Sequence, residues 1–585
     1  MKSLFPLFLI VISLYIYSCA NQGTPTGGPR DTIPPLLLET TPANKSIAYH
    51  GQEFHFIFDE RVNADKLKSQ LLITPHIENK FNVKVRKNEL TLEFDEPFSD
   101  STTFTLNFSD GVVDVTEKNP AVNLSFAFST GHYIDSIYVN GKITDLYNNE
   151  DKEGFVVGLY QLTDSLDVLK DKPRYFAKTN EQGQFLIENI KNDYYKILTF
   201  NDENKNLILN PETEAHGFLV DSLNLHLSRD SVYIRTQLIN ASEFKYIRSK
   251  NTGRYFDIQY NKPFTAYDIK KLDSTSILPI PPNNRVKGNK ILRFYPIEDF
   301  QYDVDSLGLL ITATDSMFNQ THDTTYIKFL ETSRKPDAFK SSFIPSDNEY
   351  VDPFVHHTYS FDKPIEKFYQ DSIIINYDTL KKEFIPDSTI SWNHNKTQLN
   401  FDILLDKHFL QNEIDTLLKI YGDTTEVDSL TTASDTANVD SVRLAKYKYF
   451  SKVNTNQVTL TFPKGTFISI EGDSSASVQH TYKFKSLDQL GSVSGQINTS
   501  YDSYTLQLVN AKYEVIEELH NTAEFSFPFV KPGKYTFRVM IDNNSDGRWS
   551  YGNILKDEMA ESVYFYSEIF DVRANWQLEN IQISF

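Results

Sequence analysis

The hexapeptide at positions 542–547, D-N-N-S-D-G, has the residue types and spacing of the start of a calcium-binding loop. Asp542, Asn544 and Asp546 stand at alternate positions before a glycine. Three hard oxygen ligands followed by a sharp turn suit Ca²⁺. An EF-hand also needs a Glu at the twelfth position, where this chain has Asn553, and we expect strands rather than helices on both sides. Two interpretations stay open: a weak calcium site, or a hairpin turn capped by Asp542.

Other metal-binding and catalytic patterns do not emerge. The 13 histidines lack metal-ligand spacing, and the adjacent pair His356-His357 falls on an expected strand, where neighbours point to opposite faces. The sequence has no P-loop, no Rossmann glycine pattern and no G-x-S-x-G. Two glycosidase carboxylates could meet in the folded chain, but 78 acidic residues give no means of choosing them. We therefore predict no catalysis, and no cofactor apart from that calcium.

Aromatic side chains gather near the end of the chain and could form a ligand platform. Flat aromatic faces bind sugars and peptides, whereas most aromatics at strand spacing belong to a core. Both interpretations stay open for Trp549 and Trp576. Their aromatic neighbours in this region are Tyr551, Tyr564 and Tyr566.

Cys19 is the only cysteine and ends an apolar N-terminal segment. The run from Leu4 to Tyr17 follows Lys2 and is too short for a membrane-spanning helix, so it predicts a signal-peptide core. Ser18 directly before Cys19 resembles a bacterial lipobox, in which the cysteine is acylated and becomes the new N-terminus. An ordinary signal peptide is the alternative, but a lone thiol in an oxidising compartment is a liability unless it is used. We expect a lipid anchor at Cys19.

The residues after the cysteine favour the outer membrane. Positions 20–30, ANQGTPTGGPR, are expected to form a flexible tether. Asn21 is not the aspartate that, by the common sorting rule, retains a lipoprotein in the inner membrane. The periplasmic and the extracellular face both stay open. Apart from the leader, we expect no segment that spans a bilayer.

The composition favours strands and excludes one class of partner. Lys plus Arg number 58 and Asp plus Glu 78, so the net charge is −20, which repels nucleic-acid phosphates. With 43 Phe and 33 Tyr the chain can form large cores, and its β-formers favour strands. We expect an all-β protein of about four or five domains.

A strand that ends in an aromatic residue occurs three times. Phe54, Phe56 and Phe58 alternate with polar residues and lead into D-E-R-V. The same strand end returns as Y-N-K-P-F at 260–264 and F-D-K-P-I at 361–365, where the proline marks the end of the strand. Several short alternating strands in each unit predict a β-sandwich.

The first of these units resembles a known family. D-T-I-P-P at 31–35, F-D-E-R-V at 58–62 and F-S-T-G at 128–131 resemble the bacterial Ig-like domain named after the S-layer protein SbsA. The leader at 19–31 is similar to that of Bacteroidetes lipoproteins that carry this domain. The resemblance covers residues 31–131 and extends more weakly to the two later units. It implies an Ig-like fold and a cell-envelope location, and no catalytic residues.

A second repeat joins segments 340 positions apart. V-N-G-K-I at 139–143 matches V-S-G-Q-I at 493–497. The pattern resembles prealbumin-like or carboxypeptidase-regulatory-like β-sandwiches, which act as spacers or binding accessories. We expect each Phe to face the core, each Tyr to begin the next strand and each Asp to cap its closing turn. The matched residues are Phe185, Tyr195, Asp202 and Asn204 with Phe525, Tyr535, Asp542 and Asn544.

These patterns divide the chain. Residues 422–441 contain five acidic residues and no basic or aromatic ones, so we expect a disordered acidic insertion, either a solvated loop or a partner-binding segment. The predicted parts are a signal peptide (1–18), a tether (19–30), an SbsA-type Ig-like domain (31–131), a prealbumin-like sandwich (132–235), an Ig-like sandwich (236–334), another that carries the insertion (335–487) and a second prealbumin-like sandwich (488–585).

Two functions fit these expectations. The first is a non-catalytic cell-envelope lipoprotein, a multi-domain scaffold or binding protein of the outer membrane, with the membrane and envelope proteins or glycans as partners. The second is a carbohydrate-binding or carbohydrate-processing surface lipoprotein that uses Trp549 and Trp576. Saturable glycan binding that is lost in Trp549→Ala or Trp576→Ala would favour the second.

Overall fold

The computed structural model describes most of the chain after residue 30. The leader, Cys19 and residues 423–441 of the expected insertion lie outside the described residues. Two compact units divide the rest: an N-terminal unit that runs to Asp145 and includes Glu150–Asn210 and Glu214–Leu238, and a C-terminal unit of Leu146–Asn149, Pro211–Thr213 and Ile239–Phe585. The described residues are 31–122, 124–252, 254–296, 306–330, 333, 335–348, 350–351, 354–377, 380–383, 390–404, 407–422, 445–448, 451, 457–484 and 489–585.

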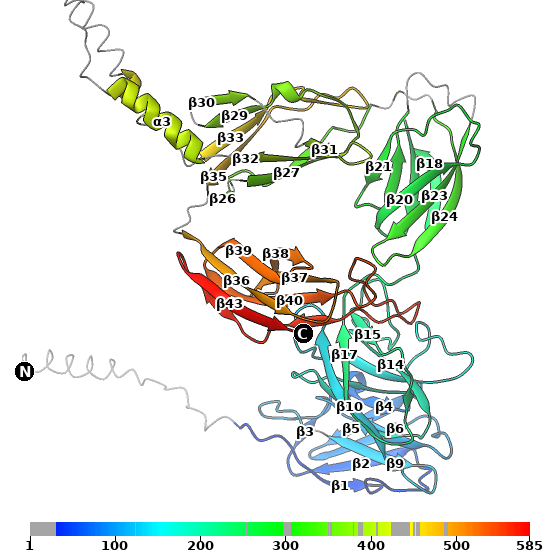
Figure 1. The fold of residues 1–585 in the computed structure, drawn as a ribbon. Helices are drawn as coiled ribbons and strands as arrows, with labels where there is room; N and C mark the ends of the chain where they lie inside the picture. The colour runs from blue at the N-terminus through cyan, green and yellow to red at the C-terminus, as the bar shows by residue number, and fades with distance from the viewer. Residues whose placement is uncertain are drawn as a thin grey trace, which may run out of the picture. The chain divides into compact units, whose positions relative to one another are not determined.

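The first β-sandwich begins the N-terminal unit (Figure 1). Its alternating phenylalanines Phe54, Phe56 and Phe58 are fully buried and form the centre of an aromatic core, as the strand pattern predicts. One sheet has the order β1 (Leu37–Thr41), β2 (Glu53–Phe58), β6 (Glu89–Phe94), β5 (Phe81–Arg86), and the other has β4 (Leu72–Thr74), β7 (Thr103–Asn107), β9 (Ser125–Ser129). A short pair, β3 (Val62–Asn63) and β8 (Val113–Asp114), and the helix α2 (Leu67–Gln70) complete it.

The second sandwich combines a three-stranded and a five-stranded sheet. The smaller sheet has the order β13 (Gln184–Ile190), β10 (Ile137–Asp145), β17 (Arg229–Thr236), and β17 runs parallel to β10. The larger sheet has the order β12 (Tyr175–Lys178), β11 (Val156–Gln161), β14 (Tyr194–Phe200), β15 (His216–Phe218), with β16 (Leu223–Asn224) also on β14.

The third and fourth sandwiches lie in the C-terminal unit. The third pairs the sheet β18 (Tyr246–Thr252), β19 (Tyr255–Tyr260), β22 (Ile291–Phe294), β21 (Asn283–Val286) with β20 (Phe264–Lys271), β23 (Leu307–Asp315), β24 (Gln320–Ile327). One sheet of the fourth sandwich has the order β25 (Ser341–Ile344), β27 (Phe354–Phe361), β32 (Gln398–Leu404), β31 (Ile390–Trp392). The other has the order β26 (Tyr350–Val351), β35 (Val478–Phe484), β33 (Gln457–Phe462), β29 (Ile374–Tyr377), β30 (Leu380–Glu383). The pair β28 (Ile365–Phe368) and β34 (Phe467–Ser469) and the 3-10 turn η1 (Gln370–Ser372) complete it.

A helix in the fourth sandwich was not expected from the sequence. The helix α3 (Lys407–Gly422) follows β32 and ends where the expected acidic insertion begins. Ile414 is 3% exposed and Leu418 is partly buried, and both pack on the core of this sandwich. Their spacing of four residues places them on one side of the helix. Among the described residues, no helix has the length and apolar character needed to cross a membrane.

The last sandwich repeats the strand order of the second, as the residue spacing predicts. Gly141 on β10 and Gly495 on β36 explain the shared V-x-G-x-I motif, because a Cβ would lie 1.9 Å from the carbonyl oxygen of Val232 and 2.0 Å from that of Ile581. The smaller sheet of the last sandwich has the order β39 (Glu524–Val530), β36 (Gly491–Asn498), β43 (Gln577–Ser584). Its larger sheet has the order β38 (Val515–His520), β37 (Tyr504–Asn510), β40 (Gly533–Ile541), β41 (Val563–Phe565), with β42 (Phe570–Val572) also on β40. The all-β fold class of tandem sandwiches is thus confirmed.

Candidate functional site

Three strand ends share one hydrogen-bonding pattern. The carboxylate or amide after the aromatic residue accepts the backbone N–H of the residue directly before the neighbouring edge strand, at 2.8–2.9 Å. The next strand then begins with a bond to a residue of positive φ in a neighbouring turn. The first contact joins Asp59 to Leu36, Asn261 to Lys245 and Asp362 to Lys340, and the second joins Val62 to Lys87, Phe264 to Asn289 and Ile365 to Lys396. The repeat of strand ends seen in the sequence is therefore also a repeat in structure.

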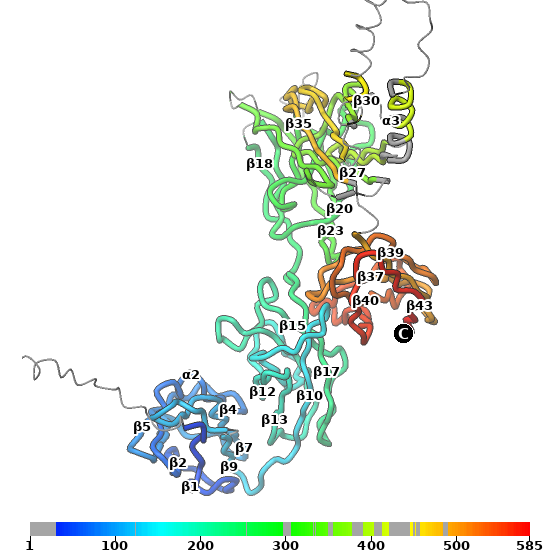
Figure 2. Tube along the Cα trace, turned by 90° about the vertical axis from the view of Figure 1, so that its left-hand side faces the viewer, coloured from blue at the N-terminus to red at the C-terminus, as the bar shows by residue number. Residues whose placement is uncertain are grey.

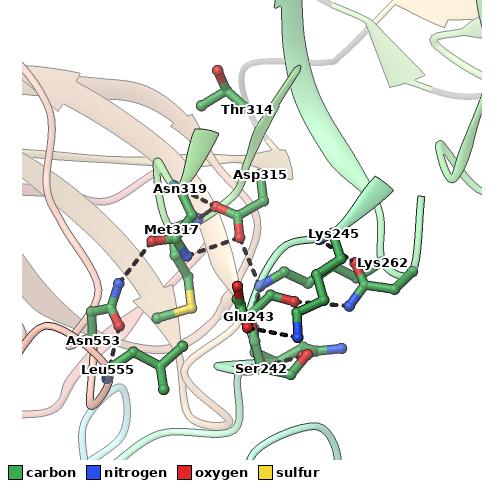
Figure 3. A network of polar contacts seen from close by, with 12 residues as sticks. Ser242, Glu243, Lys245, Lys262, Thr314, Asp315, Met317, Asn319, Asn553 and Leu555 are labelled. Atoms are coloured by element: carbon green, nitrogen blue, oxygen red, sulfur yellow. Dashed lines mark hydrogen bonds and ion pairs between the residues drawn. The ribbon is translucent and has the colours of Figure 1, made fainter. Parts of the chain in front are cut away.

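In the third sandwich this strand end holds a buried ion pair. The Lys262 ammonium lies 2.7 Å from the Asp315 carboxylate, and the two side chains are 3% and 1% exposed (Figure 3). Asp315 also accepts the backbone N–H groups of Met317 and Asn319, at 2.9 and 2.8 Å, and Lys262 donates to the carbonyl of Ser242 at 2.6 Å. A buried charge pair is tolerated when its remaining hydrogen-bonding capacity is met in this way.

In the fourth sandwich Lys363 stands at the equivalent position. Its ammonium lies 2.7 Å from Glu471 and 2.5 Å from Asp473. Glu471 is 2% exposed and also receives two groups of the third sandwich: the Tyr255 hydroxyl donates to it at 3.0 Å, and Arg254 Nε lies 2.9 Å away. This carboxylate therefore joins two sandwiches of the C-terminal unit.

A buried arginine completes this junction. Arg293 on β22 makes two bonds to Asp257, at 2.8 and 3.0 Å, and one to Asp337 at 2.7 Å. Its guanidinium lies 4.1 Å from the ring centre of Tyr255. Asp337 lies in the segment that leads into the fourth sandwich, and its N–H donates to the Tyr255 hydroxyl at 3.0 Å. Bidentate arginine–carboxylate pairs fix orientation as well as distance.

The first sandwich departs from this pattern in charge. Val62 pairs with Asp114 as Phe264 pairs with Asp315, so Glu60 occupies the position of Lys262. Asp114 is fully buried, and although burial opposes its charge, hydrogen bonds from the backbone after it lower its pKa to about 2. Burial and the carboxylates of Asp114, Asp31 and Asp59 raise the pKa of Glu60. In the part of the chain that the structure describes, no group of three or more His, Cys, Asp or Glu could hold a metal ion.

A cleft of about 920 Å³ lies within the N-terminal unit, between its two sandwiches. The first sandwich contributes alternate residues of β4 and β7, which shows that a sheet face forms this wall: Leu72, Thr74, Thr105 and Asn107. The second contributes the consecutive residues 176–178 of β12 and 184–188 of β13, with Asn140 and Gly141 of β10. The edges of its two sheets and the adjoining part of the smaller sheet therefore form the other wall. Figure 2 shows β4 and β7 beside β12 and β13.

Hydrogen bonds hold the walls of this cleft together. The backbone N–H of His76 donates to the carbonyl of Arg174 at 2.8 Å, and Asn189 donates to the Thr105 hydroxyl at 2.8 Å. Lys172 lies 2.5 Å from Glu78 at the rim. The cleft is therefore preformed, as most ligand sites at domain boundaries are.

The structure brings Asp542, Asn544 and Asp546 into one turn after β40. Asp542 is 4% exposed and accepts the N–H groups of Asp546 and Gly547, at 3.2 and 2.9 Å, and the Ser503 hydroxyl at 2.7 Å. Although burial raises the pKa of Asp542, these bonds lower it below its ordinary value. Calcium binding at this turn stays a prediction.

The earlier copy forms the same turn. Asp202 accepts the N–H groups of Asn206 and Leu207, at 3.0 and 3.1 Å. Lys205 and Leu207 have positive φ there, as Ser545 and Gly547 have in the later copy. The turn therefore forms without the acidic residue and the glycine that the calcium pattern requires.

The two tryptophans of the expected platform have different surroundings. Trp549 lies 6.0 Å from the ring of Tyr147 and 5.2 Å from that of Tyr551, and its indole N–H donates to the carbonyl of Ser562 at 3.3 Å. Trp576 is 52% exposed, with Arg573 4.8 Å from its ring centre. Glycan binding by this pair stays a prediction.

Comparison with known proteins assigns the first sandwich. Residues 31–130 match the bacterial Ig-like domain family. A search of curated proteins finds no match. Among solved structures the chain is similar to the S-layer protein rSbsC (8% identity, 92% of this chain and 67% of that one, TM-score 0.15) and to BcpA, the major pilin subunit of Bacillus cereus (10%, 77% and 98%, 0.12). An L,D-transpeptidase from Mycobacterium smegmatis matches at 11% identity over 28% of this chain and 76% of that one, with a TM-score of 0.13.

The Ig-like domain thus has a family match, whereas the third and fourth sandwiches share its strand-end pattern. Sequence reasoning missed the ion pairs and the cleft. The Lys-Pro dipeptides at 262–263 and 363–364 were a signal for the pairs, because a lysine fixed beside a strand end needs a carboxylate partner. The cleft had no such signal, because it depends on how two sandwiches dock.

Proposed function

We propose that this chain is a non-catalytic lipoprotein of the outer membrane, anchored through Cys19, which acts as a multi-domain scaffold or binding protein of the cell envelope. The observation that carries the proposal is the buried ionic junction around Glu471 and Arg293. The charged groups of this junction contact one another and connect two sandwiches, and they do not line an open site.

A scaffold requires fixed spacing between its modules. Neighbouring domains joined by small polar interfaces move relative to one another by default. Charged hydrogen bonds that are removed from water resist such motion, because breaking one leaves an unpaired buried charge. Lys363 and Arg254 both form ion pairs with the buried Glu471 carboxylate, at 2.7 and 2.9 Å, and the Tyr255 hydroxyl donates a hydrogen bond to it, so these contacts cross the junction.

The same architecture leaves room for a binding role. The cleft in the N-terminal unit is preformed and mixes polar with apolar groups, as binding sites do. Its lining contains no pairing of a nucleophile with a base, so it suits recognition rather than chemistry.

The anchor is tested with Cys19→Ala in the native host. We expect an unprocessed precursor, or protein that no longer fractionates with outer membranes, because the acyl acceptor is gone. Asn21→Ala is the matched control and should still incorporate labelled palmitate. Membrane-bound, acylated protein from Cys19→Ala would overturn the anchoring part of the proposal.

A further inference from the structure

The edge strand β13 lacks the protective residues that its counterpart in the last sandwich carries. Both strands end their three-stranded sheets, and both alternate buried and exposed residues in the same order. Each strand has three exposed positions: the first holds Gln184 in β13 and Glu524 in β39. At the other two, β13 has Leu186 and Glu188, where β39 has Ser526 and Pro528. Proline and small polar residues on an edge are devices that prevent the addition of another strand.

Pro528 also shows which way the backbone points. Proline has no N–H, yet β39 keeps its pairing with β36. The N–H at this position is therefore not needed for pairing within the sheet. By the equivalence of the two sandwiches, the Glu188 N–H points away from β10 and towards the open edge.

The cleft runs along this open edge. Residues 184–188 of β13 all line it, together with Asn140 and Gly141 of the neighbouring strand β10, so the cavity reaches the open edge of β13 and the sheet face beside it. Leu186 is 49% exposed there. Thr74 and Thr105 of the first sandwich form part of the facing wall. A strand placed about 4.8 Å from β13 would occupy the cleft.

We propose that an extended segment of a partner protein adds to β13 as a fourth strand inside this cleft. The proposal rests on the binding role proposed above and gives its ligand class. Main-chain bonds to β13 supply affinity, and alternate side chains supply specificity. A folded second copy does not fit, because the first sandwich closes the far side of the cleft.

Charge and polarity define the incoming segment. Leu186 and Glu188 are two residues apart and lie on one face of β13, so their cross-strand neighbours are also two residues apart. An apolar residue suits Leu186, and a lysine or arginine suits Glu188. Asp110 adds a second carboxylate to the lining, against the single ammonium of Lys178, which favours a basic segment.

The test uses the full lipidated chain in detergent and a labelled nine-residue peptide, Thr-Val-Thr-Lys-Thr-Val-Thr-Lys-Thr, followed by fluorescence anisotropy. We expect saturable binding that weakens as salt rises. Glu188→Pro, which copies Pro528, should weaken binding at least about tenfold, because it removes an edge N–H that pairing needs. Glu188→Gln is the matched control and should weaken it only a few-fold while reducing its salt dependence.

Two further measurements keep the outcome decisive. A peptide that is N-methylated at its valines and lysines should not bind, because these residues lie opposite Leu186 and Glu188 and the methyl groups replace the N–H groups that face β13. In the unmodified chain, amide exchange over residues 184–188 should slow when the peptide is added. Peptide binding unchanged by Glu188→Pro, or exchange unchanged on β13, overturns the proposal. Acylation at Cys19 is scored separately, so failure of the anchor and failure of the strand site are distinguishable.

Discussion

At the scale of the residue, one position changes sign between related sandwiches. The third sandwich places Lys262 beside Asp315, whereas the first places Glu60 beside Asp114. Both buried aspartates are capped by backbone N–H groups, so each turn is stable without a cation. The lysine therefore adds a charge partner to a turn that already exists. The carboxylate of Glu60 adds repulsion instead.

Glu60→Lys should stabilise the first sandwich by about 1 kcal/mol, a small value because the position is partly exposed and the pair is screened by solvent. The raised pKa of Glu60 means that its ionised form opposes folding. The advantage of the lysine should therefore shrink as the pH falls through that pKa. Calorimetric melting of the two proteins, with Glu60→Gln as the charge-removal control, measures this. A lower melting midpoint for the lysine variant would contradict it.

His357 predicts a pH dependence in the fourth sandwich. The side chain is 1% exposed and stacks on Phe401 at 4.8 Å. Burial lowers its pKa to about 4, opposed by the backbone of Val355 and by Asp402 and assisted by the charges of His356 and His480. A histidine whose folded pKa is lowered contributes full stability above its unfolded value near 6.5. That stability falls between pH 6.5 and 4, because the unfolded chain binds the proton first.

We expect this loss to reach about 3 kcal/mol near pH 4. Calorimetric melts at intervals between pH 7 and 4 measure it. His357→Leu should flatten the dependence, whereas the exposed neighbour His356, changed to Gln, should leave most of it in place. Equal pH dependence in wild type and His357→Leu would mean that another group is responsible.

At the scale of the element, the sequence predicts the features that depend only on residues close together along the chain. The three strand ends and the spacing of Phe185 and Phe525 reflect alternation and turn chemistry, and both phenylalanines are buried as expected, at 4% and 3% exposure. The helix α3 was missed because its flanks are strands and its apolar stripe is short. The junction and the cleft were not predictable, because Tyr255 meets Glu471 from 216 positions away. Local patterns do not contain such pairings.

Gly141→Ala should unfold the small sheet of the second sandwich. A Cβ there would lie 1.9 Å from the carbonyl oxygen of Val232, so β10 and β17 must separate. We expect a cost of at least about 3 kcal/mol, in the upper range of single substitutions. Gly533→Ala, whose nearest contact would be 3.3 Å from Tyr535, is the control. Chemical unfolding followed by circular dichroism reports both, and comparable losses would show that the close approach is not the cause.

At the scale of the whole molecule, a set of charged residues of the C-terminal unit lies where its third and fourth sandwiches meet. Lys363, Glu471, Arg254 and Tyr255 form one connected set, and Arg293 extends it through Asp337. Apolar contacts alone would let two sandwiches slide, because they have no direction. Bidentate and charged hydrogen bonds have direction, so they select one arrangement.

Glu471→Gln should therefore loosen the junction without unfolding either sandwich. The amide keeps the size of the side chain but leaves Lys363 with only the Asp473 carboxylate and Arg254 without its charge partner. Spin labels on an exposed strand of the third and of the fourth sandwich should give one narrow distance distribution in wild type and a broad one in the variant. Glu243→Gln removes an exposed ion pair with Lys245 and should leave the distribution narrow. A narrow distribution in Glu471→Gln would show that the fixed spacing has another source, and the scaffold proposal would lose its main support.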